Sequence, residues 1–246
     1  MRLRSAAVVV VSAILLTGCG GGDQAEPETS SGSAAATGQT SETPQSEESS
    51  EPTEAPVPSE SSSPAADDLL LELPDEAMLA ADELEPAGEV RGTVEGPGDW
   101  ILGSACLVPP PSAVAMRTVT QGLYESTDPV GIQQVAVFAT VDEAVDAAAT
   151  VAAAMESCAT NPPAESGSYR VEDVTVGTQG RGLANNYAEL GDDAPGTYAA
   201  VTRRGNAVTV VSLMSGEESV GTAREMVDRG LDRAFDALCL YDSAGC

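Results

Sequence analysis

The sequence predicts an α+β domain in which a mostly antiparallel sheet of about six to seven strands packs against two long helices, after a signal peptide and a disordered linker. Three observations support this class. Apolar periodicity begins only at residue 67, the later elements run as a long helix, four strands and a second long helix, and a Gly-Asn pair joins the last two strands. The helices are expected to cover the sheet that these strands form.

The first part of the domain is expected to contain one short helix and three strands. Residues 73–84 predict a helix, because a proline is tolerated in a first turn and Asp75 complements the helix dipole. Strands are predicted at residues 88–98, 114–124 and 132–139. The last of these is apolar on both faces, which indicates a central strand covered on both sides.

A capping box opens the first long helix. The Thr140 hydroxyl is expected to accept the amide hydrogen of Glu143, while the Glu143 carboxylate reaches back to the Thr140 amide. The helix runs to about Ala159, and the Asn-Pro-Pro of residues 161–163 ends it. Five residues are expected to form its apolar stripe: Val141, Val145, Ala148, Ala152 and Met155.

The last third of the chain predicts a strand-rich segment and a second long helix. The strands are expected at residues 169–176, 182–190, 197–204 and 207–214. Gly205-Asn206 separates the last two strands, and such a pair between two β-like runs is typical of a hairpin. The helix is predicted over residues 217–238. Its apolar stripe comprises Val220, Ala223, Val227, Leu231, Ala234 and Leu238.

Composition excludes several classes of function. The formal charge is −28, from 39 acidic and 11 basic residues, and every basic residue is an arginine. Such a charge repels phosphate backbones, so nucleic acid is not an expected partner. The chain contains no histidine, which removes the usual general base of serine and cysteine hydrolases and the commonest metal ligand.

The N-terminus predicts a bacterial lipoprotein signal over residues 1–18. Arg2 and Arg4 precede an apolar region, residues 6–16, that is too short to span a bilayer core of about 30 Å. Leu-Thr-Gly-Cys at residues 16–19 resembles a lipobox. This resemblance implies that Cys19 carries a diacylglycerol and that its amine is acylated, for example with palmitate. We therefore expect a lipid anchor on the outer face of the cell membrane.

Residues 19–66 predict a disordered acidic tether rich in Ser, Pro and Glu. Val57 is the only large aliphatic residue in the stretch, and no aromatic residue occurs there. Such a segment cannot bury enough apolar area to offset the entropy lost on ordering. Residues 67–246 form the folded domain, which is long enough for one substantial core.

Four cysteines besides Cys19 predict disulfides, because an even number outside the reducing cytosol favours pairing. Three pairings are possible. We favour Cys106 with Cys158 and Cys239 with Cys246, the second because it closes a short C-terminal loop. A thiolate metal site is the alternative, but the cysteines have no CxxC spacing, and no metal or cofactor is expected.

Few residues are candidates for chemistry. Adjacent carboxylates occur at residues 172–173 and 192–193, but neighbours on a strand point to opposite faces, and residues 191–196 are typical of a loop. A weak calcium site in that loop is the alternative. Trp100 is expected to pack near the Cys106 disulfide, with a binding surface as the second interpretation. The possible binding surface comprises Trp100, Tyr124, Tyr187 and Tyr198.

Three features of the sequence resemble the PknH-like extracellular sensor domains of actinobacteria. They are residues 134–140 (QVAVFAT), the Asp-Glu-Ala of residues 142–144 and a helix that ends near Cys158. Those domains pair a strand of this type with an alanine-rich helix that carries a cysteine near its end. The resemblance implies an α+β domain with two disulfides and a broad cleft, found on receptor kinases and on stand-alone lipoproteins. It also supports pairing Cys106 with Cys158.

These observations favour a membrane-anchored lipoprotein with a non-enzymatic sensor or binding domain. Its expected partner is an envelope protein or a small-molecule ligand. A cell-envelope hydrolase that uses paired carboxylates is the first alternative, and it requires two carboxyl groups about 5 to 9 Å apart in one cleft. A structural envelope lipoprotein is the second alternative.

Overall fold

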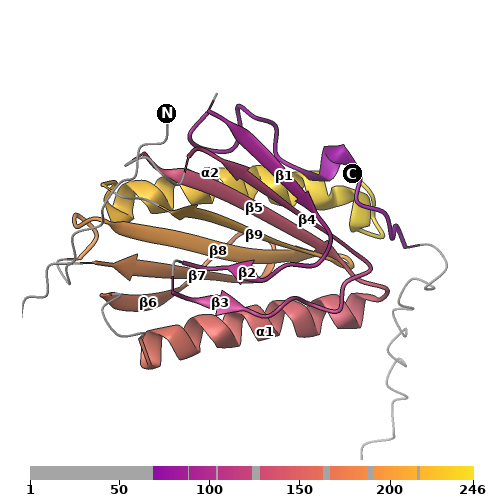
Figure 1. Ribbon diagram of the computed structural model, residues 1–246. Coiled ribbons are helices and arrows are strands. Elements are labelled where there is room, and N and C mark those ends of the chain that lie inside the picture. Colours follow the sequence, from indigo (N-terminus) through magenta and orange to yellow (C-terminus); the bar gives the residue numbers. More distant parts are fainter. Residues whose placement is uncertain are drawn as a thin grey trace, which may run out of the picture. The chain divides into compact units, whose positions relative to one another are not determined.

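Seven strands form a single antiparallel sheet in the order β1-β4-β5-β9-β8-β7-β6 (Figure 1). The strands are β1 (Arg91–Glu95), β4 (Ala115–Gln121), β5 (Val130–Val137), β6 (Ser168–Asp173), β7 (Thr178–Asn186), β8 (Gly196–Arg204) and β9 (Ala207–Met214). The α+β class and the number of strands that the sequence predicts are therefore confirmed.

The computed structural model describes residues 69–87, 89–103, 105–123, 128–162, 167–187, 191–214 and 217–246. The predicted signal, the lipid-attachment residue Cys19, the tether over residues 19–66 and Tyr124 lie outside the described residues. Within the described part of the chain, no helix is long and apolar enough to cross a membrane.

Strand β5 lies in the middle of the sheet, between β4 and β9, and all eight of its residues are buried. Its alternating side chains enter two separate apolar cores, so that Val135 faces one core and Ala136 faces the other. This confirms the central, doubly covered strand that the apolar run predicts.

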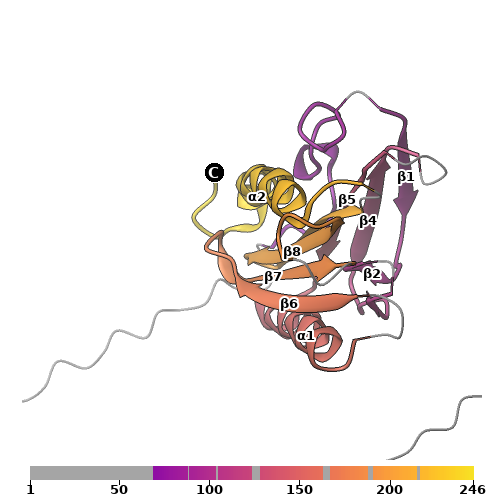
Figure 2. The same ribbon diagram turned by 90° about the vertical axis from the view of Figure 1, so that its left-hand side faces the viewer.

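Helices α1 (Val141–Thr160) and α2 (Val220–Ala237) cover opposite faces of the sheet (Figure 2). The α2 core includes Val227 and Leu231, and the α1 core includes Ala148 and Val151. A sheet with apolar residues on both faces needs a layer on each side, because either face left bare would expose apolar area to water.

Helix α1 begins as the capping box predicts, with one difference. The Thr140 hydroxyl accepts the Glu143 amide hydrogen at 3.1 Å, but the Glu143 carboxylate accepts from the Ala139 amide rather than from that of Thr140. The predicted stripe is also partly wrong. The fully buried residues of α1 are Ala144, Ala148, Val151 and Met155.

Helix α2 follows its predicted stripe, and all six residues of that stripe are buried. Ser219 caps its first turn by accepting the amide hydrogen of Thr222 at 3.1 Å. The 3-10 turn η3 (Leu238–Tyr241) extends its end. The predicted hairpin is confirmed as well, because Arg204 pairs with Ala207 across a turn in which Gly205 has a φ of +55°.

The prediction of a helix over residues 73–84 is wrong. A three-residue 3-10 turn, η2 (Asp75–Ala77), stands at its start, and the chain then continues in turns. The Leu79 amide donates to the side-chain oxygen of Gln133 on β5 at 2.7 Å, instead of to a helical carbonyl. This path buries Leu79 and Leu84 in the α2 core, and that burial outweighs a weak helical preference.

A second sheet of two short strands, β2 (Trp100–Ile101) and β3 (Leu107–Val108), lies on the α1 side. The structure pairs Cys106 with Cys158 and Cys239 with Cys246, as the sequence favours, with Cα atoms 6.2 and 4.7 Å apart. The first disulfide ties the β2–β3 hairpin to the end of α1.

Candidate functional site

Trp100 lies at the bottom of the candidate site, and hydrogen bonds from Gln134 on β5 hold the residues on either side of it. The Gln134 side chain accepts from the Ile101 amide at 2.7 Å and donates to the Asp99 carbonyl at 2.8 Å, so it holds the residues on both sides of Trp100. Trp100 is 1% exposed and shares the α1 core with Cys106. The tryptophan is therefore held in place before any ligand arrives.

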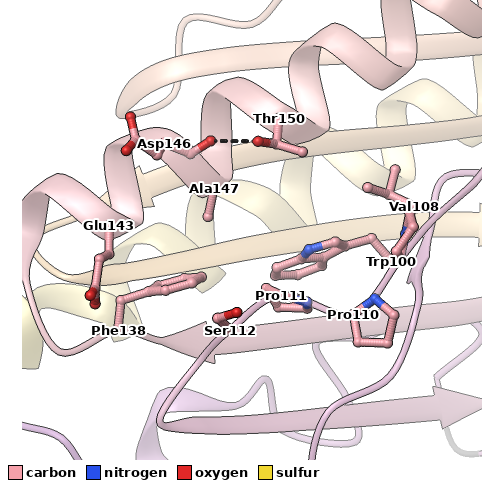
Figure 3. Close-up of a pocket in the computed structure, with 11 residues that line it drawn as sticks. Trp100, Val108, Pro110, Pro111, Ser112, Phe138, Glu143, Asp146, Ala147 and Thr150 are labelled. Atoms are coloured by element: carbon pink, nitrogen blue, oxygen red, sulfur yellow. Dashed lines mark hydrogen bonds between the residues drawn. The ribbon is translucent and has the colours of Figure 1, made fainter.

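A groove of about 380 Å³ opens above Trp100, between the segment after β3 and the first turns of α1 (Figure 3). Pockets that hold small ligands have volumes of roughly 300–1,000 Å³. The residues that line it are Trp100, Val108, Pro109, Pro110, Pro111, Ser112, Phe138, Glu143, Asp146, Ala147 and Thr150.

The floor and one wall of the groove are apolar. Trp100 and Phe138 line the groove but are 1% and 3% exposed, so almost none of their ring surface is accessible. Pro110 and Pro111 form the wall opposite α1 (Figure 3). Proline has a fixed φ and loses little freedom on binding, so this wall is rigid. On the helix side, the small Ala147 leaves room beside the rings.

Two carboxylates stand on the helix side of the groove. Glu143 and Asp146 are three residues apart, so they lie on one face of α1. Neither takes part in the ion pairs found among the described residues. Glu143 accepts the Ala139 amide hydrogen, whereas Asp146 keeps its carboxylate free of the capping box.

The groove lining includes two further groups that can donate hydrogen bonds, the Trp100 indole and the Thr150 hydroxyl. The indole nitrogen of Trp100 makes no hydrogen bond to the other lining residues (Figure 3). The Thr150 hydroxyl, by contrast, donates to the backbone carbonyl of Asp146 at 2.8 Å.

A second hollow, of about 580 Å³, lies on the α2 side against β1 and β4. Its arginines already have partners. Arg117 pairs with Asp75 at 2.8 Å and with Glu95 at 2.5 Å, and Arg91 donates to Gln121. These contacts hold the segment before β1 on the sheet, which leaves the groove beside Trp100 as the better candidate.

The acidic pairs noted in the sequence lie elsewhere. Glu172 on β6 and Asp192 in the β7–β8 loop are both bound by Arg170 and Arg224, with N···O distances of 2.6 to 2.8 Å. The hydrogen bonds from Arg224 and then Arg170 hold the pKa of Asp192 far below its usual value. Asp192 is therefore ionised and cannot serve as a proton donor near neutral pH.

Among the described aromatic residues of the predicted binding surface, Trp100 and Tyr198 do not come together. Trp100 lies in the α1 core and Tyr198 in the α2 core, on opposite faces of the sheet. Tyr198 is 1% exposed beneath the Arg224 guanidinium, which is 5.3 Å from its ring centre, and burial raises its pKa. Tyr187 is 39% exposed. Trp100 and Tyr198 therefore do not share one surface, and Tyr124 lies outside the described residues.

Several groove residues were not anticipated from the sequence, chiefly residues 109–112 and the helix residues Glu143, Asp146, Ala147 and Thr150. A run of three prolines close to the single tryptophan of the chain was the available signal. Among the described residues, no group of three or more His, Cys, Asp or Glu side chains is placed to hold a metal ion.

Comparison with known proteins does not identify a family. No protein-family model matches the chain, and no curated protein sequence matches it. Among solved structures, the extracellular domain of PknH from Mycobacterium tuberculosis is similar at 16% identity with a TM-score of 0.36. The match covers 50% of this chain and 64% of that structure, so the chain spans less than two thirds of its length. A likeness at this level does not establish a shared fold or family.

Proposed function

We propose that the chain is a lipid-anchored extracytoplasmic lipoprotein whose α+β domain binds a ligand without transforming it. The groove beside Trp100 is the binding site, and it carries the proposal because its apolar floor is assembled in advance. Gln134 fixes the tryptophan from the sheet, and the disulfide from Cys106 fixes the hairpin to α1. Such preorganisation lowers the entropy cost of binding.

The residues of the groove favour binding over catalysis. Their reactive groups are two carboxylates and two hydroxyls, and the chain offers neither histidine nor lysine to activate a nucleophile. The motif at residues 16–19 supports the anchor, and the two disulfides support an oxidising compartment outside the cytosol.

A hydrolase is the second candidate, because Glu143 and Asp146 share one groove. The carboxyl groups of a glycosidase flank the bond that is broken. In Figure 3 the Glu143 carboxylate lies beside Phe138, whereas the Asp146 carboxylate points away from the aromatic rings, so the two groups do not flank one position in the groove.

A screen of small fragments against the full-length protein tests the proposal. Ala147→Leu fills the groove, whereas Ala149→Leu adds the same side chain at an exposed position of α1 outside it. Both changes are mild for helix propensity. We expect fragments that bind the unchanged protein and Ala149→Leu but not Ala147→Leu. Fragments that bind all three proteins equally, or none at all, would reject the groove as the binding site.

A further inference from the structure

We propose that two copies of this chain associate through the free edge of β1, so that the sheet of one copy continues into the sheet of the other. The proposal is independent of the groove beside Trp100. It follows from one juxtaposition: in this exposed edge strand, Arg91 and Glu95 stand at equal distances on either side of Thr93.

Strand β1 lies at one edge of the sheet and pairs with β4 alone (Figure 2). The carbonyl of residue 90 accepts from the chain at the end of β4, and the amide of residue 96 donates to β4, both at 2.8 Å. Bonding alternates along an antiparallel strand, so Arg91, Thr93 and Glu95 turn their backbone groups away from β4. Among the described residues, these outward groups have no partner. Such an edge is a template for another strand.

The edge is open on both faces of the sheet. On the α1 side, Val94 is 66% exposed, and a Cβ atom added to Gly92 would have no atom of a non-neighbouring residue within 4 Å. On the α2 side, the hollow of about 580 Å³ runs along Arg91, Thr93 and Glu95. A second strand can therefore approach β1 without displacing a described element.

An antiparallel pairing centred on Thr93 makes the strand complementary to itself. Arg91 of each copy then lies opposite Glu95 of the other copy, Thr93 lies opposite Thr93, and each outward amide and carbonyl finds a partner. Opposite charges and threonine pairs directly across two strands are both favourable. On the other face, each Val94 lies opposite a Gly92, whose missing side chain leaves room for the valine.

The neighbouring registers are less favourable. A shift in one direction places Glu95 opposite Glu89, which sets like charges against each other. A shift in the other direction places Arg91 opposite Pro97, which has no amide hydrogen to donate. The sequence of the strand therefore selects a two-fold symmetric dimer, which is closed, rather than an open chain of copies.

The side chains of Arg91 and Glu95 keep groups for the second copy. Arg91 donates to Gln121 and to the Leu79 carbonyl through its terminal nitrogens, and its Nε has no partner among the described residues. Glu95 binds Arg117 through Oε1, whereas Oε2 has no partner in the described part of the chain. The chain as a whole is acidic, but charges beyond about 8 Å are screened at physiological salt, so the facing pairs dominate the contact.

Sedimentation equilibrium of the full-length protein in mild detergent tests the proposal. The contact is small, so we expect a reversible dimer whose population rises with concentration. Arg91→Glu and Glu95→Arg each place like charges opposite one another, so each is expected to weaken self-association at least about tenfold. An equal mixture of the two variants restores both pairs of opposite charge and is expected to associate within about twofold of the unchanged protein.

Cross-linking in the membrane gives a second measurement that does not need the charge variants. Thr93→Cys places two thiols on the two-fold axis, where Cα atoms about 5.5 Å apart allow a disulfide. Val90→Cys is the control, because residue 90 is exposed as well but lies about 20 Å from its counterpart in this register. Under mild oxidation we expect at least about fivefold more disulfide-linked dimer from Thr93→Cys.

Four results would overturn the proposal. They are the mass of one chain at every concentration, masses that keep growing beyond two chains, a mixture that associates as weakly as the single variants, and equal cross-linking in Thr93→Cys and Val90→Cys. If circular dichroism shows that a charge variant does not fold, the cross-linking comparison decides the question.

Discussion

Arg224 on α2 forms a bidentate ion pair with Glu172 on β6, with Nη2–Oε1 at 2.8 Å and Nε–Oε2 at 2.9 Å. Both side chains are 23% exposed. The pair joins the second helix to the strand at one edge of the sheet, and the third nitrogen of Arg224 reaches Asp192 in the loop between β7 and β8. One guanidinium thus connects three elements that are far apart in the sequence.

Replacing Arg224 is expected to destabilise the fold. Arg224→Gln leaves Glu172 partly buried without its main partner, which costs about 1–2 kcal/mol of unfolding free energy. Urea denaturation monitored by circular dichroism measures the loss. Arg181→Gln serves as the control, because Arg181 and Asp173 are 40% and 85% exposed and their pair is expected to contribute less than about 0.5 kcal/mol. Equal losses in the two variants would contradict the assigned role of Arg224.

The same cluster predicts how stability depends on acid. The arginines lower the pKa of Asp192 in the folded protein, so its ionised form stabilises the fold above the unfolded value of about 3.9. That contribution declines as the pH falls below about 4. Urea midpoints at pH 7 and pH 3 should differ less in Asp192→Asn than in the unchanged protein, whereas Asp193→Asn should keep the original difference. A difference that is the same in both variants would show that Asp192 does not contribute.

The two disulfides are expected to stabilise the domain unequally. Cys106–Cys158 spans 52 residues of sequence and Cys239–Cys246 spans 7. Restriction of the unfolded chain gives about 4 kcal/mol for the longer loop and about 2 kcal/mol for the shorter. Double replacement of each pair by alanine, followed by denaturation, measures both values. A larger loss from the C-terminal pair would contradict the loop-length explanation.

The spacing of apolar residues predicted the buried face correctly where only one side of an element is apolar. The α2 stripe from Val220 to Leu238 is correct because charged residues occupy its other face. Helix α1 is rich in alanine on several faces, so spacing alone could not decide that Ala144 and Val151, rather than Val145 and Ala152, face the sheet. Close packing of small residues against the sheet determines which face of α1 is buried.

The candidate site was only partly predictable. Trp100 was identified from its type, but its neighbours in the groove come from the proline segment after β3 and from α1, which are joined by folding rather than by sequence proximity. The face of the sheet that Tyr198 occupies could not be predicted, because every residue of its strand up to Thr202 is buried and alternation therefore does not show which core receives it.

Replacement of the predicted lipidated cysteine tests the anchor. Cys19→Ser removes the thiol that would carry the diacylglycerol, and without acyl chains the strongly acidic protein has little attraction to a membrane surface. We expect at least about tenfold less protein in the membrane fraction and a matching gain in the soluble extracytoplasmic fraction. Full recovery of the variant with the membranes would contradict lipid attachment at Cys19.

Binding in the groove beside Trp100 is tested most directly by the indole N–H signal in a nitrogen–proton correlation spectrum, because the chain has a single tryptophan. Titration of the full-length protein with a small fragment that binds it is predicted to shift this signal to saturation, to do the same in Ala149→Leu, and to leave it unmoved in Ala147→Leu. A signal that stays fixed while the fragment binds, or that shifts equally in Ala147→Leu, would contradict the account.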